Sequence, residues 1–221
     1  MRRHLLILPL VATLSACIDI PQAQAPHRQT VRQSTTAFSP RPEFRQCLSE
    51  LGAQQATFTP LPDQYFGAGC STVNAVRLSS LHGDSASLSL TNLGPVTCDM
   101  ASMFAAWARY GVDRAAEQIL GSRLVRIETF GSYNCRNVAG TSRRSGHATA
   151  NAIDVSAFVL ADGRRISVLD GWDHGTRAER QFLRIVHASA CKRFGTTLGP
   201  DYNAAHTNHF HLEDDGGSYC R

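Results

Sequence analysis

The segment Ser145-Gly146-His147-Ala148-Thr149-Ala150-Asn151-Ala152-Ile153-Asp154 decides how we expect this 221-residue chain to fold. The last residues of this segment begin a mostly apolar stretch, which predicts a strand over residues 152–160. Side chains alternate across a strand, so Asp154 points opposite to its apolar neighbours. His147 lies at the entry to this strand and is placed to fold over the same face as the carboxylate.

A second segment, His206-Thr207-Asn208-His209-Phe210-His211, lies far downstream. His209 and His211 are two residues apart, so in a strand both project to the side opposite Phe210. His206 comes in from the preceding turn. Either segment alone is explained by chance clustering or by a structural hydrogen bond. Together they offer imidazole nitrogens and a carboxylate, the donors that zinc takes, and a catalytic zinc needs about three of them. The pair of segments therefore predicts one zinc site.

Six cysteines besides Cys17 indicate a disulfide framework in an oxidising compartment. No Cys-x-x-Cys is present, so the spacing does not fit a Cys-rich zinc site. Of the fifteen possible pairings, we expect the neighbour pairing, namely Cys47–Cys70, Cys98–Cys135 and Cys191–Cys220.

The first residues have the features of an export signal, with Arg2 and Arg3 before a short apolar run. The signal ends in Leu14-Ser15-Ala16-Cys17, which resembles the bacterial lipobox. An ordinary cleaved signal with a chance cysteine is the alternative, but Cys17 stands where the apolar run stops. We therefore expect a lipoprotein signal over residues 1–17, with acyl chains on Cys17 holding the chain to a membrane. By resemblance to enterobacterial lipoprotein sorting, Ile18 after the cysteine favours the outer membrane, facing the periplasm.

Residues 18–40 are rich in Gln, Thr, Ser, Ala and Pro, which predicts a flexible tether before a domain over residues 41–221. The net charge is only +4, and no basic run with interleaved aromatic residues appears, so we expect no nucleic-acid partner. We expect a monomer.

Within the domain, residues 41–70 contain several prolines and glycines and predict short irregular structure. Gly111 is expected to end the first long helix, and Phe182, Ile185 and Val186 to form the buried stripe of the last one. Strands are expected over residues 73–78, 86–90, 124–129, 152–160, 164–169 and 207–213, and helices over residues 97–110, 113–120 and 176–193. These elements predict an α+β fold, with flanking helices on a small, mostly antiparallel sheet stapled by disulfides.

The two histidine segments also carry a family resemblance. Ser145-x-His147-x-x-Ala150-x-Ala152-x-Asp154 resembles the Ser-x-His-x-x-Gly-x-Ala-x-Asp motif of the D-Ala-D-Ala metallopeptidases. The second segment resembles the second motif of the penicillin-insensitive murein endopeptidases, in the same hedgehog/DD-peptidase superfamily. From about residue 42 onward, the chain resembles the bacterial extensin-like C-terminal domain family. Ala150 departs from the family glycine, and the Glu-x-x-His signature of the carboxypeptidase branch is absent, which favours the endopeptidase-like branch.

This resemblance implies that His147, Asp154 and His211 are zinc ligands. It places His209 as a base or transition-state stabiliser and His206 as a further active-site residue. It implies a zinc-dependent peptidase acting on peptidoglycan stem peptides, and the alternative is a non-catalytic zinc lipoprotein that binds the cell wall. A third possibility is a disulfide-bonded domain without metal.

A peptide carboxylate in the substrate would need a cation, and arginine suits bidentate carboxylate binding. Arg136, Arg143 and Arg144 lie near the first motif, and we take Arg136, Arg144 and Ser145 as substrate-binding residues. When each residue is considered alone, solubility of the loop explains the arginines equally well, and capping of the turn explains Ser145.

Overall fold

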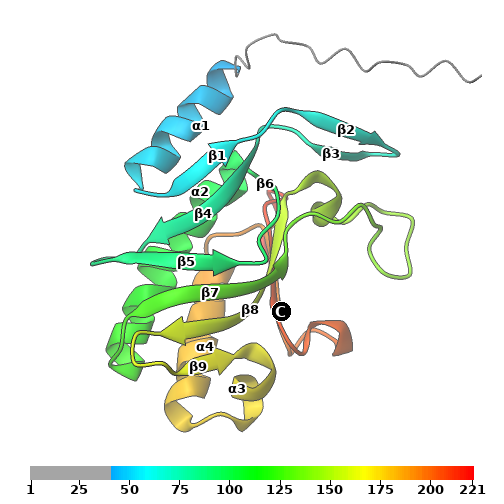
Figure 1. Ribbon diagram of the computed structural model, residues 1–221. Helices are drawn as coiled ribbons and strands as arrows, with labels where there is room; N and C mark the ends of the chain where they lie inside the picture. The colour runs from blue at the N-terminus through cyan, green and yellow to red at the C-terminus, as the bar shows by residue number, and fades with distance from the viewer. Residues whose placement is uncertain (1–40) are drawn as a thin grey trace, which may run out of the picture. The chain divides into compact units, whose positions relative to one another are not determined.

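A ten-stranded, mostly antiparallel sheet organises residues 41–221, the part of the chain that the computed structural model describes (Figure 1). Eight strands run in the order β1-β4-β5-β7-β8-β11-β10-β12, with β6 beside β4 and β9 beside β8. Only β5–β7 and β10–β12 are parallel within the described sheet. Its strands are β1 (Thr57–Pro60), β4 (Ala75–His82), β5 (Ser87–Thr91), β6 (Val96–Thr97), β7 (Leu124–Gly131), β8 (Ala152–Leu160), β9 (Arg165–Ser167), β10 (Thr196–Leu198), β11 (Phe210–Glu213) and β12 (Tyr219–Cys220).

Four α-helices complete the domain, together with a separate hairpin of β2 (Gln64–Gly67) and β3 (Cys70–Thr72). Figure 1 shows α2 and α4 behind the sheet. This arrangement confirms the α+β fold class. The helices are α1 (Pro42–Ala53), α2 (Cys98–Trp107), α3 (Val168–His174) and α4 (Arg177–Cys191).

The core lies between the helices and the inner face of the sheet. Trp107, fully buried at the end of α2, donates its indole N–H to the carbonyl of Val186 on α4 at 3.2 Å. Phe158 of β8 packs edge-on against Phe182 of α4, with ring centroids 5.4 Å apart. Phe210 of β11 lies beside Phe158. Aromatic packing therefore fixes β8 and β11 against the helices and leaves their other face for polar side chains.

Residues 42–53 form helix α1, so the expectation of irregular structure over residues 41–70 was wrong for this part. Pro42 occupies the first turn, where its missing N–H costs nothing. Phe44, Cys47 and Leu51 are buried at helical spacing. Proline breaks the interior of a helix, but at the start of a helix it is favourable.

Gly111 does not end the helix that begins at Cys98. The helix continues through a π-helical turn over Ala108–Asp113 and a second over Ala116–Leu120. A β-carbon at Gly111 would collide with the hydroxyl of Ser189 on α4. The glycine is therefore explained by the close approach of two helices, not by a chain break.

The last helix, α4, begins with a capping box in which Thr176 and Glu179 each bond the other's backbone N–H. Phe182 and Val186 are buried as expected, but Ile185 is 43% exposed and Leu183 is buried in its place. The expected return strand over residues 164–169 is shorter, because Ser167 caps α3 and ends β9.

All six cysteines of the domain are in disulfides, but two of the three expected pairs were wrong. Cys191–Cys220 is confirmed. The other pairs cross: Cys47–Cys98 joins α1 to α2, and Cys70–Cys135 joins the β2–β3 hairpin to the loop after β7.

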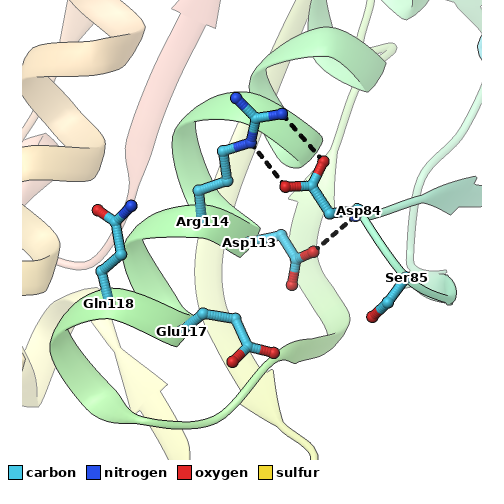
Figure 2. Close-up of a pocket in the computed structure, with 6 residues that line it drawn as sticks. All are labelled: Asp84, Ser85, Asp113, Arg114, Glu117 and Gln118. Carbon is cyan, nitrogen blue, oxygen red and sulfur yellow. Dashed lines mark hydrogen bonds and ion pairs between the residues drawn. The ribbon is translucent and has the colours of Figure 1, made fainter.

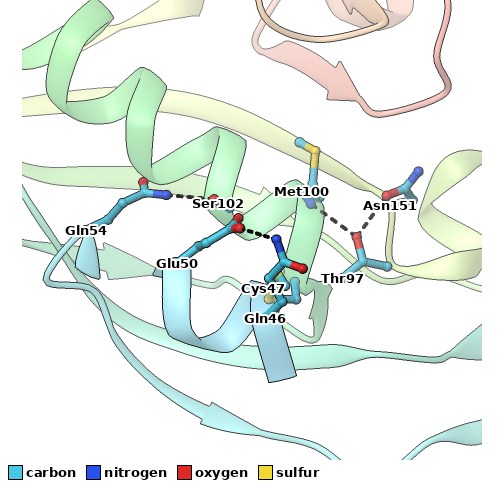
Figure 3. Close-up of a disulfide and its surroundings, with 9 residues drawn as sticks. Gln46, Cys47, Glu50, Gln54, Thr97, Met100, Ser102 and Asn151 are labelled. Atoms are coloured by element: carbon cyan, nitrogen blue, oxygen red, sulfur yellow. Dashed lines mark hydrogen bonds between the residues drawn. A yellow bond between two sulfur atoms is a disulfide. The ribbon is translucent and has the colours of Figure 1, made fainter. Parts of the chain in front are cut away.

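Figure 3 shows the surroundings of Cys47, where Gln54, directly after α1, also donates to Ser102 of α2 at 2.7 Å. The pairing follows helix packing, which neighbour order along the chain does not reveal.

The expected signal, the lipidated Cys17 and the tether over residues 18–40 lie outside the described residues. Among residues 41–221, no helix is both long and apolar enough to cross a bilayer. Three disulfides fit a compartment outside the cytoplasm.

Candidate metal centre

Strands β8 and β11 pair antiparallel, and their register places Asp154 directly opposite His211. The residues that flank each of them, such as Ile153 and Leu212, are fully buried against the helices. Asp154 and His211 therefore project together from the other face of the sheet. Oδ1 of Asp154 lies 2.9 Å from Nδ1 of His211.

His147 reaches this pair from a 3₁₀ turn over Gly146–Thr149. Ser145 begins the turn, and its hydroxyl accepts the backbone N–H of His147 at 3.4 Å, which is the capping role considered for it above. Nε2 of His147 lies 3.1 Å from Oδ2 of Asp154 and 3.2 Å from Nδ1 of His211. The three predicted ligands are thus brought together, with one donor atom from each within 4.8 Å of the others.

In the rings of His147 and His211, the nitrogen that faces away from Asp154 has a partner of its own. Nδ1 of His147 lies 3.0 Å from the carbonyl of Ser132, and Nε2 of His211 lies 3.0 Å from Oε2 of Glu213. Both partners are acceptors, so these nitrogens carry the N–H. This is the arrangement that orients histidine ligands in metal sites.

The electrostatics of the centre suit a cation. Burial alone would raise the pKa of Asp154, but hydrogen bonds from His147 and His211 lower it well below its ordinary value. Burial alone would lower the pKa of His211, but Asp154 and Glu213 together raise it to about 9. A charged carboxylate and two imidazole nitrogens thus converge at one point. A divalent cation fits the same donors, which are the set that zinc takes.

His209 and His206 lie beside this group. Nε2 of His209 is 3.5 Å from Oδ1 of Asp154, and the His206 ring centroid is 5.0 Å from that of His209. Burial lowers the pKa of His209, and burial with the neighbouring histidines lowers the pKa of His206 to about 4. Both rings are therefore neutral near pH 7 and able to accept a proton.

The segment that carries these histidines is less extended than expected. Residues 204–206 form a 3₁₀ turn, and β11 starts only at Phe210. Asn203 caps the turn: its side-chain oxygen accepts the backbone N–H of Ala205 at 3.0 Å and lies 2.7 Å from Nδ1 of His206. The turn brings His206 over the sheet, where a continuous strand would have carried it away.

A groove of about 280 Å³ opens over the centre and is lined by Ser145, His206 and His209 among others. Arg136 and Arg143 line its wall, and within the described chain neither guanidinium has a carboxylate at ion-pair distance. Arg144 does not line the groove. Its guanidinium donates instead to the carbonyl of Ala68 at 2.6 Å and to Asn137 at 2.8 Å, holding the β2–β3 hairpin against this loop.

Sequence reasoning missed three groups that hold the centre in place. The Ser132 carbonyl is a backbone atom without a sequence signal. Asn151 accepts a hydrogen bond from Thr97 at 2.9 Å and also donates to the carbonyl of Asp214, tying the first motif to α2 and to the end of β11. Glu213 follows His211 in the same strand. Its spacing of two from His211 was the available signal.

Two other polar clusters in residues 41–221 are structural. His187, Cys191 and Cys220 lie together, but the two sulfurs are bonded to each other and are not thiolate ligands.

A hollow of about 470 Å³ beside Asp84 is lined by acidic residues, yet the carboxylates of Asp84 and Asp113 are engaged (Figure 2). Asp84 pairs with Arg109 and Arg114. The buried Asp113 accepts the backbone N–H groups of Asp84 and Leu124.

The fold and the site define a disulfide-stapled α+β domain with a buried His/Asp/His group suited to a metal ion. Residues 45–221 match the model of the extensin-like protein C-terminus family. The chain therefore belongs to this family, as its motifs had indicated. No curated protein and no solved structure matches the chain significantly.

Proposed function

We propose that the protein is a zinc-dependent peptidase that acts on peptidoglycan stem peptides or cross-links at the cell envelope. One observation carries the proposal: two neutral histidines, His206 and His209, stand beside the group of His147, Asp154 and His211 on the floor of an open groove. Three ligands with an exposed side are the arrangement of a catalytic zinc site, whereas a structural zinc has four protein ligands.

A zinc ion held by His147, Asp154 and His211 would supply a Lewis acid and an activated water. The chain would supply the proton transfers. His209 is the first candidate for the general base, because its ring lies against Asp154 and its lowered pKa keeps it neutral. His206, one ring further along the groove, is the second.

The groove wall indicates the kind of substrate. Arg136 and Arg143 present two guanidinium groups with no carboxylate at ion-pair distance among the described residues, although Asp215 interacts with Arg143 at longer range. Such groups bind carboxylates in bidentate fashion. Stem peptides carry free carboxylates. The substrate-binding role expected for Arg144 therefore falls to its neighbour Arg143 in this proposal. A lipid anchor on Cys17 and a tether over residues 18–40 would hold this domain near the wall layer.

Digestion of purified muropeptides tests the proposal. We expect new fragments with the zinc-loaded protein, none after chelation, and recovery when zinc is restored. Tight binding of zinc and of sacculi without fragments would instead establish the non-catalytic wall-binding lipoprotein. Absence of metal after purification without a histidine tag would overturn both.

A further inference from the structure

We propose that Glu213 is the positioning residue of the metal centre and that Gly146 is present to make room for it. The inference rests on the proposed metal site and concerns two residues outside the three proposed ligands. Glu213 ends β11, two residues beyond His211, and Gly146 opens the turn that carries His147.

Glu213 contacts the nitrogen of His211 that faces away from the other ligands. Its Oε2 lies 3.0 Å from Nε2, while Nδ1 of the same ring faces Asp154 and His147. The carboxylate therefore accepts the Nε2–H and leaves the lone pair of a neutral ring on Nδ1, directed at the other donors. An outer carboxylate of this kind fixes the ring and increases its basicity as a ligand.

Gly146 is packed against the same carboxylate. A β-carbon at position 146 would lie 2.5 Å from Cδ, 2.6 Å from Oε1 and 2.8 Å from Cγ of Glu213. Real β-carbons do not approach other atoms so closely. Gly146 is not among the glycines with a positive φ, so its backbone conformation does not by itself require glycine. The space occupied by Glu213 is therefore the reason that alanine does not fit.

The two observations join the distant motifs. The glycine between Ser145 and His147 allows the carboxylate of Glu213 to lie behind His211, so the turn bearing one histidine ligand accommodates the group that orients another. Any side chain at position 146 would displace Glu213 and, through it, His211.

A double-mutant cycle on zinc affinity tests this. The dissociation constant is measured by chelator competition for the wild type, Glu213→Ala, Gly146→Ala and the double variant. We expect each single variant to weaken binding about 10- to 100-fold. We expect Gly146→Ala to add little in the Glu213→Ala background, where the obstructing atoms are gone.

Two further variants complete the test. Glu213→Gln, which keeps an acceptor, should fall between wild type and Glu213→Ala, and it carries the test if Glu213→Ala fails to fold. Asp215→Asn removes a negative charge from the same groove but contacts Thr196 and Gly217, so it should leave the zinc affinity unchanged.

A spectroscopic readout separates positioning from a merely structural role. In ¹⁵N spectra of the zinc-loaded protein, His211 should be protonated at Nε2 in the wild type, with that proton exchanging faster in Glu213→Ala. Equal zinc affinities for wild type and Glu213→Ala, or additive losses in the cycle, would overturn the inference while leaving the metal site intact. A wild type that binds no zinc would overturn both.

Discussion

Asp154 and His211 come from strands 57 residues apart in the sequence, yet they are paired in register and their side chains meet at 2.9 Å. The backbone ladder between β8 and β11 thus positions two of the proposed metal ligands, and the turn that carries His147 positions the third. A site built on paired strands is held more rigidly than one built on loops.

The first prediction concerns metal content. Asp154→Asn and His211→Ala should each abolish the binding of one zinc per chain, because three ligands are the minimum for a firm catalytic site. The fold should persist, since the core and the three disulfides do not involve these side chains. Elemental analysis and circular dichroism check the two parts. Full zinc occupancy in either variant would contradict the assignment.

The second prediction concerns pH. In the metal-free protein the pKa of His211 is raised to about 9, so at neutral pH the ring carries a proton that a metal ion must displace. Zinc affinity should therefore rise with pH until about 9, and binding at pH 7 should release one proton from this ring. Calorimetry in buffers of different ionisation enthalpy measures the release. An affinity independent of pH between 6 and 8 would count against His211 as the displaced acid.

The third prediction separates catalysis from metal binding. His209→Gln should keep zinc but lower kcat about 10²- to 10⁴-fold, the usual effect of losing a general base. The lowered pKa of His209 means that wild-type activity should be lost only as the solution becomes acidic enough to protonate it. Rates across pH on a defined muropeptide provide the measurement. Undiminished turnover by this variant would transfer the base role to His206.

The fourth prediction uses two adjacent arginines. Arg143→Ala should raise KM for a peptide with a free carboxylate about tenfold, because a charge-assisted hydrogen bond contributes roughly 1.5–3 kcal/mol. Arg144→Ala should instead lower the melting temperature, because Arg144 holds the carbonyl of Ala68. Amidation of the substrate carboxylate should remove the KM difference between wild type and Arg143→Ala. A KM unaffected by Arg143→Ala would remove that residue from the binding site.

Several features followed from the sequence alone, because they depend on local pattern. Strand β8 has the expected bounds, since only Asp154 and Ser156 interrupt its apolar residues and a turn follows Leu160. Helices α2 and α4 begin directly after Thr97 and Thr176, the residues at which the two expected helices start. Family membership, and the assembly of His147, Asp154 and His211 into one group, followed from two short motifs.

Only the tertiary structure decided the rest. The pairing of Cys47 with Cys98 depends on how α1 packs on α2, and the partners of Arg144 depend on where the β2–β3 hairpin lies. The contact of Glu213 with both His211 and Gly146 likewise requires two strands and a turn to converge. A sequence specifies which side chains are present and with what local periodicity polar and apolar residues alternate. Contacts between distant segments arise from the packing of the whole chain, so they were visible only once the sheet had been assembled.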